Sequence, residues 1–224
     1  MDNISLIIPA KNEIESLGEV LKEIENYDCV NEIIIIVDNE NDNSIQIAKE
    51  YDCKIIIQKK SGYGSAIIEW FRNAKNEYGC IYNADFSFDP KDLKKFIELS
   101  KANDFVFATR YQKDSGSDDD DWITLIGNKV FSFISKNFLR INLSDILYTY
   151  VLCNVKKFNS LNLKSNDFRL CIELPFQVSQ SKYTYAEFSS YERARYGGKK
   201  KVNVIKDGFI ILTEVVYSII KKKI

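Results

Sequence analysis

The sequence predicts an α/β fold in which a mostly parallel, Rossmann-like sheet is flanked by helices within a single domain. Short β-branched runs alternate with helical patterns along the first half of the chain. Residues 33–37 are aliphatic throughout, which suits a strand buried on both faces. The chain has 224 residues, of which 45% are hydrophobic, enough for one large α/β core. Alternating strands and helices of this kind indicate right-handed crossovers.

The elements follow from local patterns. Strands are predicted, in chain order, at residues 4–8, 33–37, 54–57, 79–83 and 104–108. Helices are predicted between them at residues 14–24, 44–51, 63–76 and from Pro90, a residue that suits a first helical turn. Beyond Arg110 we expect a loop at residues 112–121, a helix at 122–138 and a late strand at 183–188, whereas residues 143–182 carry no clear pattern. The four consecutive aspartates at 118–121 are predicted to lie in a solvated, mobile loop.

The C-terminal segment, residues 207–220, is apolar on more than one face and is followed by three lysines. One interpretation is a core or dimer helix with cations at its C-terminal end. The other is an amphipathic helix lying on an anionic membrane surface. The sequence leaves both open.

Composition excludes several classes of function. The formal net charge is −1, so no basic field indicates nucleic-acid binding. Histidine is absent, which excludes Ser-His-Asp and Cys-His catalysis and histidine-bound zinc. The five cysteines lack the spacing of a metal or redox motif and are interpreted as small buried residues of a cytoplasmic protein. We expect neither a secretory leader nor a membrane span, because no apolar run approaches ~20 residues.

Polar residues follow several of the predicted strands. Glu13 follows the first strand, Asp38 the second and Asp85 the fourth, and Arg110 follows the fifth. Functional groups of open parallel sheets lie just beyond the carboxyl ends of the strands. Together these side chains predict a polar rim suited to a charged ligand.

Five segments in this order resemble family 2 glycosyltransferases, which have the GT-A nucleotide-sugar fold. The segments are residues 7–13 (IIPAKNE), Val37-Asp38, residues 62–66 (GYGSA), Asn83-Ala84-Asp85 and residues 193–201 (RARYGGKKK). The last of them resembles the basic motif of the branch that includes dolichyl- and polyprenyl-phosphate mannosyltransferases. The resemblance implies a nucleotide-sugar-binding half at 1–112, an acceptor-side half at 113–206 and an amphipathic helix at 207–224.

The resemblance also implies roles for individual residues. Asp85 would bind Mg²⁺ or Mn²⁺, with Asn83 and Ser87 at the other metal-facing positions. The substrate-binding positions are Pro9, Lys11, Glu13, Asp38, Gly62, Asn83 and Ala84 for the nucleotide sugar, and Arg193, Arg195 and Lys201 for phosphates. Arg110 would assist catalysis at phosphate. Asp145 and Glu173 align loosely with acceptor-side acids of the family, and Asp145 is the first candidate for a general base. Three positions depart from the family pattern: Asn83 replaces an aspartate, Ser87 replaces a longer polar residue and Lys11 replaces a tyrosine.

The activity that the resemblance implies is inverting transfer of a sugar from a GDP- or UDP-sugar. A polyprenyl or dolichyl phosphate is the favoured acceptor, because an ionised phosphate needs no general base. A sugar hydroxyl is the alternative acceptor, and it would need a base such as Asp145. A degenerate protein that binds nucleotide sugars without turnover is the alternative from another class. We expect a cytoplasmic location, with attachment to the cytoplasmic membrane face as an option. A homodimer is a further option.

Overall fold

The computed structural model describes residues 3–197 and 204–222 of the chain. Its main sheet has seven strands: β1 (Ile4–Ala10), β2 (Val30–Val37), β3 (Lys54–Ile57), β4 (Tyr78–Ile81), β5 (Phe105–Thr109), β7 (Val151–Asn154) and β8 (Tyr185–Ser189). Two short strands, β6 (Gly116–Ser117) and β9 (Tyr191–Glu192), pair in parallel as a separate ribbon.

The helices alternate with the strands in the first half and cluster in the second. They are α1 (Leu17–Ile24), α2 (Ser44–Ala48), α3 (Tyr63–Phe71), α4 (Asp92–Ser100), α5 (Trp122–Ile134), α6 (Val155–Ser160), α7 (Leu170–Ser179) and α8 (Val204–Lys222). One wide turn of π-helix, η1 (Ser135–Leu139), continues α5.

The strand order is β3-β2-β1-β4-β7-β5-β8. Neighbouring strands run parallel except at β7, which is antiparallel to both β4 and β5. The register places Ile7 of β1 opposite Ile34 of β2 and Ile81 of β4. The parallel block β3-β2-β1-β4 therefore has all its carboxyl ends at one edge, where α/β proteins bind ligands.

The sheet separates two hydrophobic cores. Leu6 and Ile8 of β1 point to the layer formed by α1, α2 and α4, whereas Ile7 points to the opposite layer. This alternation follows from the two-residue period of a strand. On the second face α3, α6 and α7 cover the sheet, with Trp70 fully buried among them. Both faces are covered, which is why the central strands are apolar throughout.

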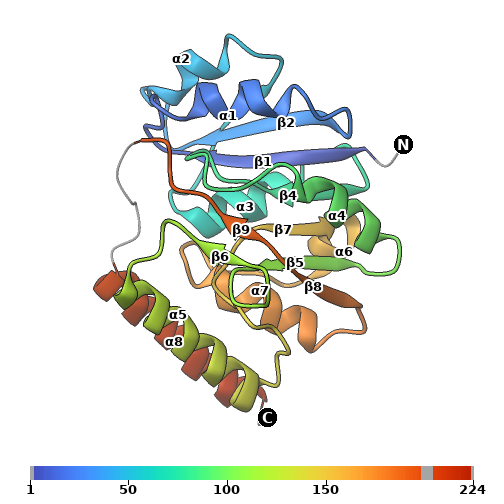
Figure 1. The fold of residues 1–224 in the computed structure, drawn as a ribbon, viewed down its shortest axis with the longest axis vertical. Helices are drawn as coiled ribbons and strands as arrows, with labels where there is room; N and C mark the ends of the chain where they lie inside the picture. The colour runs from blue at the N-terminus through green and yellow to red at the C-terminus, as the bar shows by residue number, and fades with distance from the viewer. Residues whose placement is uncertain (1–2, 198–203, 223–224) are drawn as a thin grey trace.

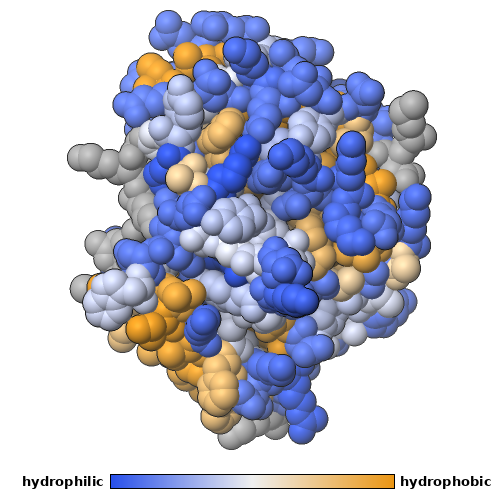
Figure 2. All heavy atoms as spheres, viewed as in Figure 1, coloured by the Kyte–Doolittle hydropathy of each residue, from blue (hydrophilic) through white to orange (hydrophobic). Residues whose placement is uncertain are grey.

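Helices α5 and α8 lie side by side at the lower left of Figure 1, outside the two layers. Together with η1, they carry eleven exposed large hydrophobic residues: Trp122, Ile123, Ile126, Val130, Phe133, Phe138, Phe209, Leu212, Val216, Tyr217 and Ile220. In Figure 2 the apolar side chains gather at this corner, over α5. We call this set the α5–α8 apolar face. No helix among the described residues is long and apolar enough to cross a bilayer.

The predicted mostly parallel sheet with flanking helices is confirmed, and all five predicted N-terminal strands are present within a few residues. The late strand is confirmed as β8, and the helix at 122–138 as α5 with η1. Residues 143–182, which carried no clear pattern, contain β7, α6 and α7.

Candidate functional site

A cleft of about 620 Å³ opens beyond the carboxyl ends of β1, β2, β3 and β4. Nine residues predicted from the sequence line it: Pro9, Lys11, Glu13, Asp38, Gly62, Asn83, Ala84, Asp85 and Arg195. The carboxyl ends of four separate strands therefore meet at this cleft, as the sequence predicts. The roles of these residues in binding stay predictions.

Asp38 lies at one end of the cleft and is surrounded by donors. Lys11 Nζ is 2.5 Å from Oδ2 of Asp38, and Ser61 Oγ donates to Oδ1 at 3.3 Å. The side-chain amide of Gln58 also donates to Oδ1. Gln58 also lines the cleft and was not predicted, because it is a neutral residue directly after the end of β3. A carboxylate held in this way presents a fixed acceptor to base N–H or ribose O–H groups.

Glu13 is held by a loop that the sequence did not reveal. Asn12 adopts a left-handed backbone with φ of 52°, and its N–H donates to both oxygens of Asp42 at 3.0 and 3.1 Å. The N–H of Glu13 donates to Ser44 Oγ at 2.9 Å. Glu13 is only 7% exposed, and Asp42 5%. Asp42 and Ser44 therefore fix the position of Glu13 without lining the cleft.

The loop after β4 gathers oxygen atoms from Asn83, Asp85 and Ser87. Oδ1 of Asp85 accepts the N–H of Ser87 at 3.0 Å, and Nδ2 of Asn83 donates to Ser87 Oγ at 3.2 Å, which turns Oδ1 of Asn83 away from that hydroxyl. Phe86 between them has φ of 73°, a rare conformation for a bulky residue that marks stored backbone strain. Asp85 and Asn83 line the cleft and offer a carboxylate and an amide oxygen to a hard divalent cation completed by phosphate and water, whereas Ser87 is 1% exposed, does not line the cleft and serves as their hydrogen-bond partner.

The glycines at the start of α3 allow a close backbone approach. Gly62 has φ of 126°, and a Cβ there would lie 2.2 Å from the carbonyl oxygen of Asn166. A Cβ on Gly64 would lie 2.2 Å from the carbonyl oxygen of Ser165. The N–H of Ser65 donates to Asn166 at 3.0 Å across this contact. The glycine-rich turn therefore docks α3 onto the segment before α7.

Glu173, which the sequence aligned loosely with acceptor-side acids, supports that same segment. Its carboxylate accepts the N–H of Lys164 at 2.9 and 3.0 Å and the N–H of Ser165 at 2.8 Å. Glu173 is 7% exposed and does not line the cleft. Its contacts are those of a residue that shapes a loop.

Arg110 lies outside the cleft, in a buried cluster of carboxylates. Its guanidinium bonds both oxygens of Asp145, and Nη1 lies 3.0 Å from Glu192 and 3.3 Å from Asp120. The ring of Tyr148 packs against it with its centroid 4.6 Å from Cζ. The neighbouring carboxylates raise the pKa of Arg110, and burial raises that of Glu192. Neither Arg110 nor Asp145 lines the cleft, and the catalytic roles predicted for them stay untested.

The four aspartates at 118–121 are bonded individually. Asp118 accepts from Tyr191, Asp119 lies 3.5 Å from Nε of Arg195, and Asp120 accepts from Tyr111 as well as pairing with Arg110. Asp121 caps α5 by accepting the N–H of Thr124 at 2.7 Å. The prediction of a solvated loop is therefore wrong for Asp119 and Asp120, which are partly buried in ion pairs, whereas Asp118 and Asp121 are exposed. The cause is that Arg110 and Arg195, distant in sequence, supply the positive partners.

The two arginines of the late basic motif behave differently. Arg193 forms a bidentate pair with Glu23 of α1 and stacks on Phe86 at 4.1 Å, so its guanidinium is committed to the fold. Arg195 lines the cleft with Nη2 3.1 Å from Oδ2 of Asp85. Lys201 lies outside the described residues.

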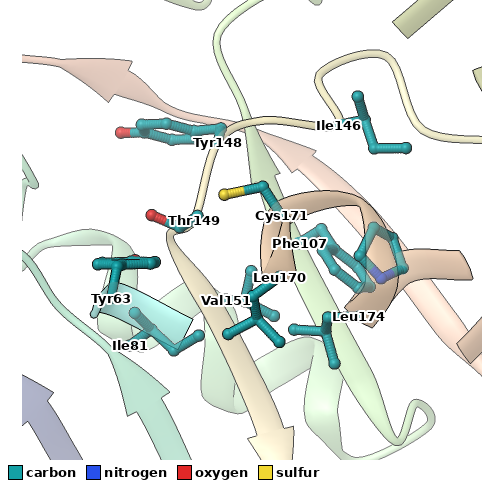
Figure 3. Close-up of a pocket in the computed structure, with 11 residues that line it drawn as sticks. Tyr63, Ile81, Phe107, Ile146, Tyr148, Thr149, Val151, Leu170, Cys171 and Leu174 are labelled. Carbon is teal, nitrogen blue, oxygen red and sulfur yellow. The ribbon is translucent and has the colours of Figure 1, made fainter. Parts of the chain in front are cut away.

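Behind Tyr63 lies a second, small cavity of about 10 Å³, which Figure 3 shows enclosed by Tyr63, Thr149 and Cys171 among apolar neighbours. Its size suits about one water molecule. Burial raises the pKa of the Cys171 thiol to about 12, so the thiol stays protonated at neutral pH. This cavity is part of the packing and holds no reactive nucleophile.

The sequence also missed the far wall of the cleft. Asp167 and Phe168 line it from the segment before α7, and Lys206, Asp207 and Ile210 line it from the first turns of α8. Strand-end reasoning cannot find these residues, because they reach the cleft only through the packing of two helices that lie late in the chain.

Comparison with known proteins agrees with this architecture. The family model described as glycosyl transferase family 2 matches residues 5–161. An uncharacterized glycosyltransferase of Mycobacterium tuberculosis (strain H37Rv) is 27% identical over 214 residues, 94% of either chain. A dolichol-phosphate mannosyltransferase of Pyrococcus furiosus is 25% identical over 215 residues, which make up 90% of this chain and 60% of that protein.

Solved structures share the fold at low sequence identity. Glucosyl-3-phosphoglycerate synthase from Mycobacterium tuberculosis, in complex with Mn²⁺ and UDP-glucose, superposes with a TM-score of 0.78 at 13% identity, covering 96% of this chain and 78% of that one. The same enzyme with Mg²⁺ and UDP gives a TM-score of 0.76 at 13% identity, with 96% and 79% coverage. Because the family model spans well over half of the residues, this chain belongs to glycosyl transferase family 2, a family of enzymes with a nucleotide-sugar fold.

Proposed function

We propose that the protein transfers a sugar, with inversion, from a nucleoside-diphosphate sugar to a polyprenyl-type lipid phosphate. The observation that supports the donor half of this proposal is the cleft at the ends of β1–β4, which is lined by both Asp38 and Asp85, the residues that the resemblance assigns to the nucleotide and the metal. UDP is the donor nucleotide in the solved relatives, and UDP- and GDP-sugars are the candidates here.

Asp85 and Asn83, the two predicted metal ligands that line the cleft, suit Mg²⁺ or Mn²⁺, the ions found in those solved structures. A bound divalent ion supplies Lewis-acid stabilisation of the charge that develops on the diphosphate leaving group. Asp85 provides the carboxylate, and its Oδ1 is oriented by the N–H of Ser87. The side chain of Arg195 adds a guanidinium in reach of the same diphosphate.

The α5–α8 apolar face supports a lipid-linked acceptor. Exposed contiguous apolar surface on this scale marks an interaction site. The first turns of α8 line the cleft, and the same helix carries Phe209, Tyr217 and Ile220, which are 69%, 57% and 55% exposed. One helix thus joins the donor cleft to a surface suited to acyl chains. A lipid phosphate bound at the membrane would reach the cleft along it.

The charges around the α5–α8 apolar face favour anionic lipid over a second copy of the chain. Within residues 122–140 and 206–222, every charged side chain of the exposed class is basic: Lys129, Lys136, Arg140, Lys206 and Lys221. Two such faces pressed together would repel, whereas each basic residue near an anionic leaflet contributes ~1 kcal/mol of binding. We therefore place this face on an anionic membrane surface.

The state of Asp145 disfavours the hydroxyl acceptor. A hydroxyl requires a general base within hydrogen-bond reach. Asp145 is 1% exposed, does not line the cleft, and has both oxygens bonded to Arg110. An ionised phosphate needs no such base, so a lipid-phosphate acceptor does not require Asp145 to line the cleft.

Activity tests the proposal directly. The protein is incubated with UDP- and GDP-sugars, Mn²⁺ and a polyprenyl phosphate, and lipid-linked sugar is extracted and quantified. We expect one donor to support turnover, Asp85→Ala to abolish it, and Glu98→Gln, an exposed change on α4, to leave it unchanged. Turnover only with a sugar hydroxyl would contradict the acceptor. Metal-dependent nucleotide binding without any turnover would instead identify a degenerate binding protein.

Flotation with vesicles tests the membrane surface. We expect binding to vesicles containing anionic lipid, weaker binding to neutral vesicles, and loss of binding at high salt, since exposed charges are screened. Phe133→Ser with Phe209→Ser should abolish flotation, whereas Ile57→Ser, an exposed apolar residue elsewhere, should not. A concentration-dependent dimer that the double substitution dissociates, without flotation of the original protein, would mean that this face pairs two copies.

A further inference from the structure

Arg195 lies between two carboxylates from different parts of the chain. Its Nη2 is 3.1 Å from Oδ2 of Asp85, and its Nε is 3.5 Å from Oδ1 of Asp119. The three side chains are 19%, 13% and 18% exposed. In this partly buried setting the ion pairs are screened less than at an open surface.

The backbone around Arg195 is anchored on both sides. The N–H of Arg193 donates to the carbonyl of Ser87 at 2.8 Å, and the N–H of Tyr196 donates to the carbonyl of Asp85 at 3.0 Å. The bidentate pair of Arg193 with Glu23 adds a side-chain anchor. The backbone at Arg195 is therefore held in place, while the Arg195 side chain can still rotate.

The Arg195–Asp85 contact conflicts with a metal ion at the same carboxylate. Oδ1 of Asp85 already accepts the N–H of Ser87, so Oδ2 is the oxygen that Arg195 and a cation would share. Two cations on one oxygen repel at close range. A nucleoside diphosphate brings several negative charges to the same place and offers the guanidinium a bidentate partner.

We propose that Arg195 is a switch between Asp85 and the donor diphosphate, and that Asp119 is the positioning residue that holds it in both states. Without donor, Arg195 neutralises Asp85 and opposes metal binding. With donor, the guanidinium transfers to the diphosphate and releases Oδ2 of Asp85. This inference rests on the proposed function for the identity of the diphosphate ligand.

The switch makes metal and nucleotide binding mutually dependent. Coupling between two ligands is reciprocal, so a nucleotide that draws Arg195 away strengthens metal binding by the same factor as the metal strengthens nucleotide binding. The neutral amide at Asn83 leaves Asp85 as the single carboxylate of the Asn83-Ala84-Asp85 segment, which makes its pairing with Arg195 decisive for the affinity of the metal.

The test measures Mn²⁺ affinity by electron paramagnetic resonance, with no nucleotide, with UDP and with GDP. We expect Arg195→Gln to tighten Mn²⁺ binding without nucleotide by at least about fivefold and to reduce the enhancement that nucleotide produces. Asp119→Asn should have the opposite effect on Mn²⁺ alone, because Arg195 then pairs with Asp85 only. Arg72→Gln, an exposed change at the end of α3, is the control.

Tighter Mn²⁺ binding in Arg195→Gln together with weaker Mn²⁺ binding in Asp119→Asn would support the switch. A purely structural role of Arg195 and Asp119 would instead weaken Mn²⁺ binding in both variants. Arg195→Lys keeps the positive charge but loses the planar guanidinium, so its Mn²⁺ affinity should lie between those of the original protein and Arg195→Gln. Circular dichroism verifies that this variant is folded. Unchanged or weaker Mn²⁺ binding in Arg195→Gln would overturn the switch. Absence of any binding of UDP or GDP to the original protein would contradict the proposed function, while the nucleotide-free arm still decides whether Arg195 opposes the metal.

Discussion

The guanidinium of Arg110 spans the carboxylate of Asp145, with Nε 2.7 Å from Oδ2 and Nη2 3.1 Å from Oδ1. Arg110 is 7% exposed and Asp145 1%, so neither charge is solvated. Removing one partner of a buried pair costs about 3–5 kcal/mol, because the other charge stays buried and unpaired. This pair connects the end of β5 to the loop before β7 and is central to the stability of that part of the fold.

We predict that Arg110→Met lowers the free energy of unfolding by about 3–5 kcal/mol at neutral pH. Asp145→Asn should cost less, because Arg110 retains Glu192 and Asp120. Urea denaturation measures both. The loss in Arg110→Met should shrink as the pH falls and the carboxylates protonate, and a loss under about 1 kcal/mol at neutral pH would contradict the buried cluster.

The four adjacent aspartates should differ in their contribution to stability. Asp121→Ala removes the cap of α5 and should cost about 1 kcal/mol. Asp120→Ala should cost more, because it strips the 7% exposed carboxylate that bonds both Arg110 and Tyr111. Asp118→Ala, at an exposed site, is the matched control and should change stability by less than about 0.5 kcal/mol. Urea denaturation measures the free energy of unfolding of the three variants. Equal losses in all three would mean that the four aspartates act only through their total charge.

Gly62 should not tolerate a side chain. Gly62→Ala places a Cβ 2.2 Å from Asn166 O in a backbone with φ of 126°, and we expect it to destabilise the fold and weaken nucleotide binding at the cleft. Gly127→Ala is the control, because nothing lies within 4 Å of a Cβ at that position in α5. It should raise the free energy of unfolding by up to ~1 kcal/mol. Thermal melting and nucleotide titration report both, and a neutral Gly62→Ala would contradict the close approach of α3 to the segment at 165–167.

Asp92 should make stability depend on pH in the mildly acidic range. Burial raises its pKa to about 6, against the opposing hydrogen bond from Ser190. Between its usual pKa of about 4 and the raised value, the folded protein binds more protons than the unfolded chain, so the free energy of unfolding falls as the pH rises through this window.

Asp92→Asn removes that titration. The free energy of unfolding of the variant minus that of the original protein should therefore rise between about pH 4 and 6 and level off above that range. Chemical denaturation at a series of pH values measures the difference. Glu98→Gln on the exposed side of the same helix serves as the matched substitution, and a flat difference for Asp92→Asn would show that its carboxyl is not perturbed.

The N-terminal half of the fold could be predicted from the sequence because its signals are local. Each strand from β1 to β4 is a β-branched or apolar run, and polar residues such as Asp38 and Asp85 mark where the strands end. Parallel strands bring these ends to one edge by topology alone, which is why eight of the nine predicted residues that line the cleft lie at or just beyond strand ends, Arg195 being the exception.

The rest depended on contacts between residues far apart in the sequence. β7 is four residues long and follows no helix-strand rhythm, so its insertion between β4 and β5 has no local signal. The partners of Arg110 lie at 120, 145 and 192, and neither their pairing nor their burial can be predicted from spacing. The arginines at 110 and 193 matched phosphate-binding positions by resemblance, yet their observed partners are carboxylates.

The position of β7 determines when the sheet can assemble while the chain is being synthesised. β5 is made before either of its sheet neighbours, β7 and β8, because both lie later in the chain. While the ribosome works through residues 110–150, β4 and β5 are both unpaired edges with apolar sequences, a state prone to wrong association. β7 joins β4 to β5 once residues 151–154 have emerged, and β8 covers the remaining edge of β5 only after Ser189, so this exposed state lasts until most of the chain has been made.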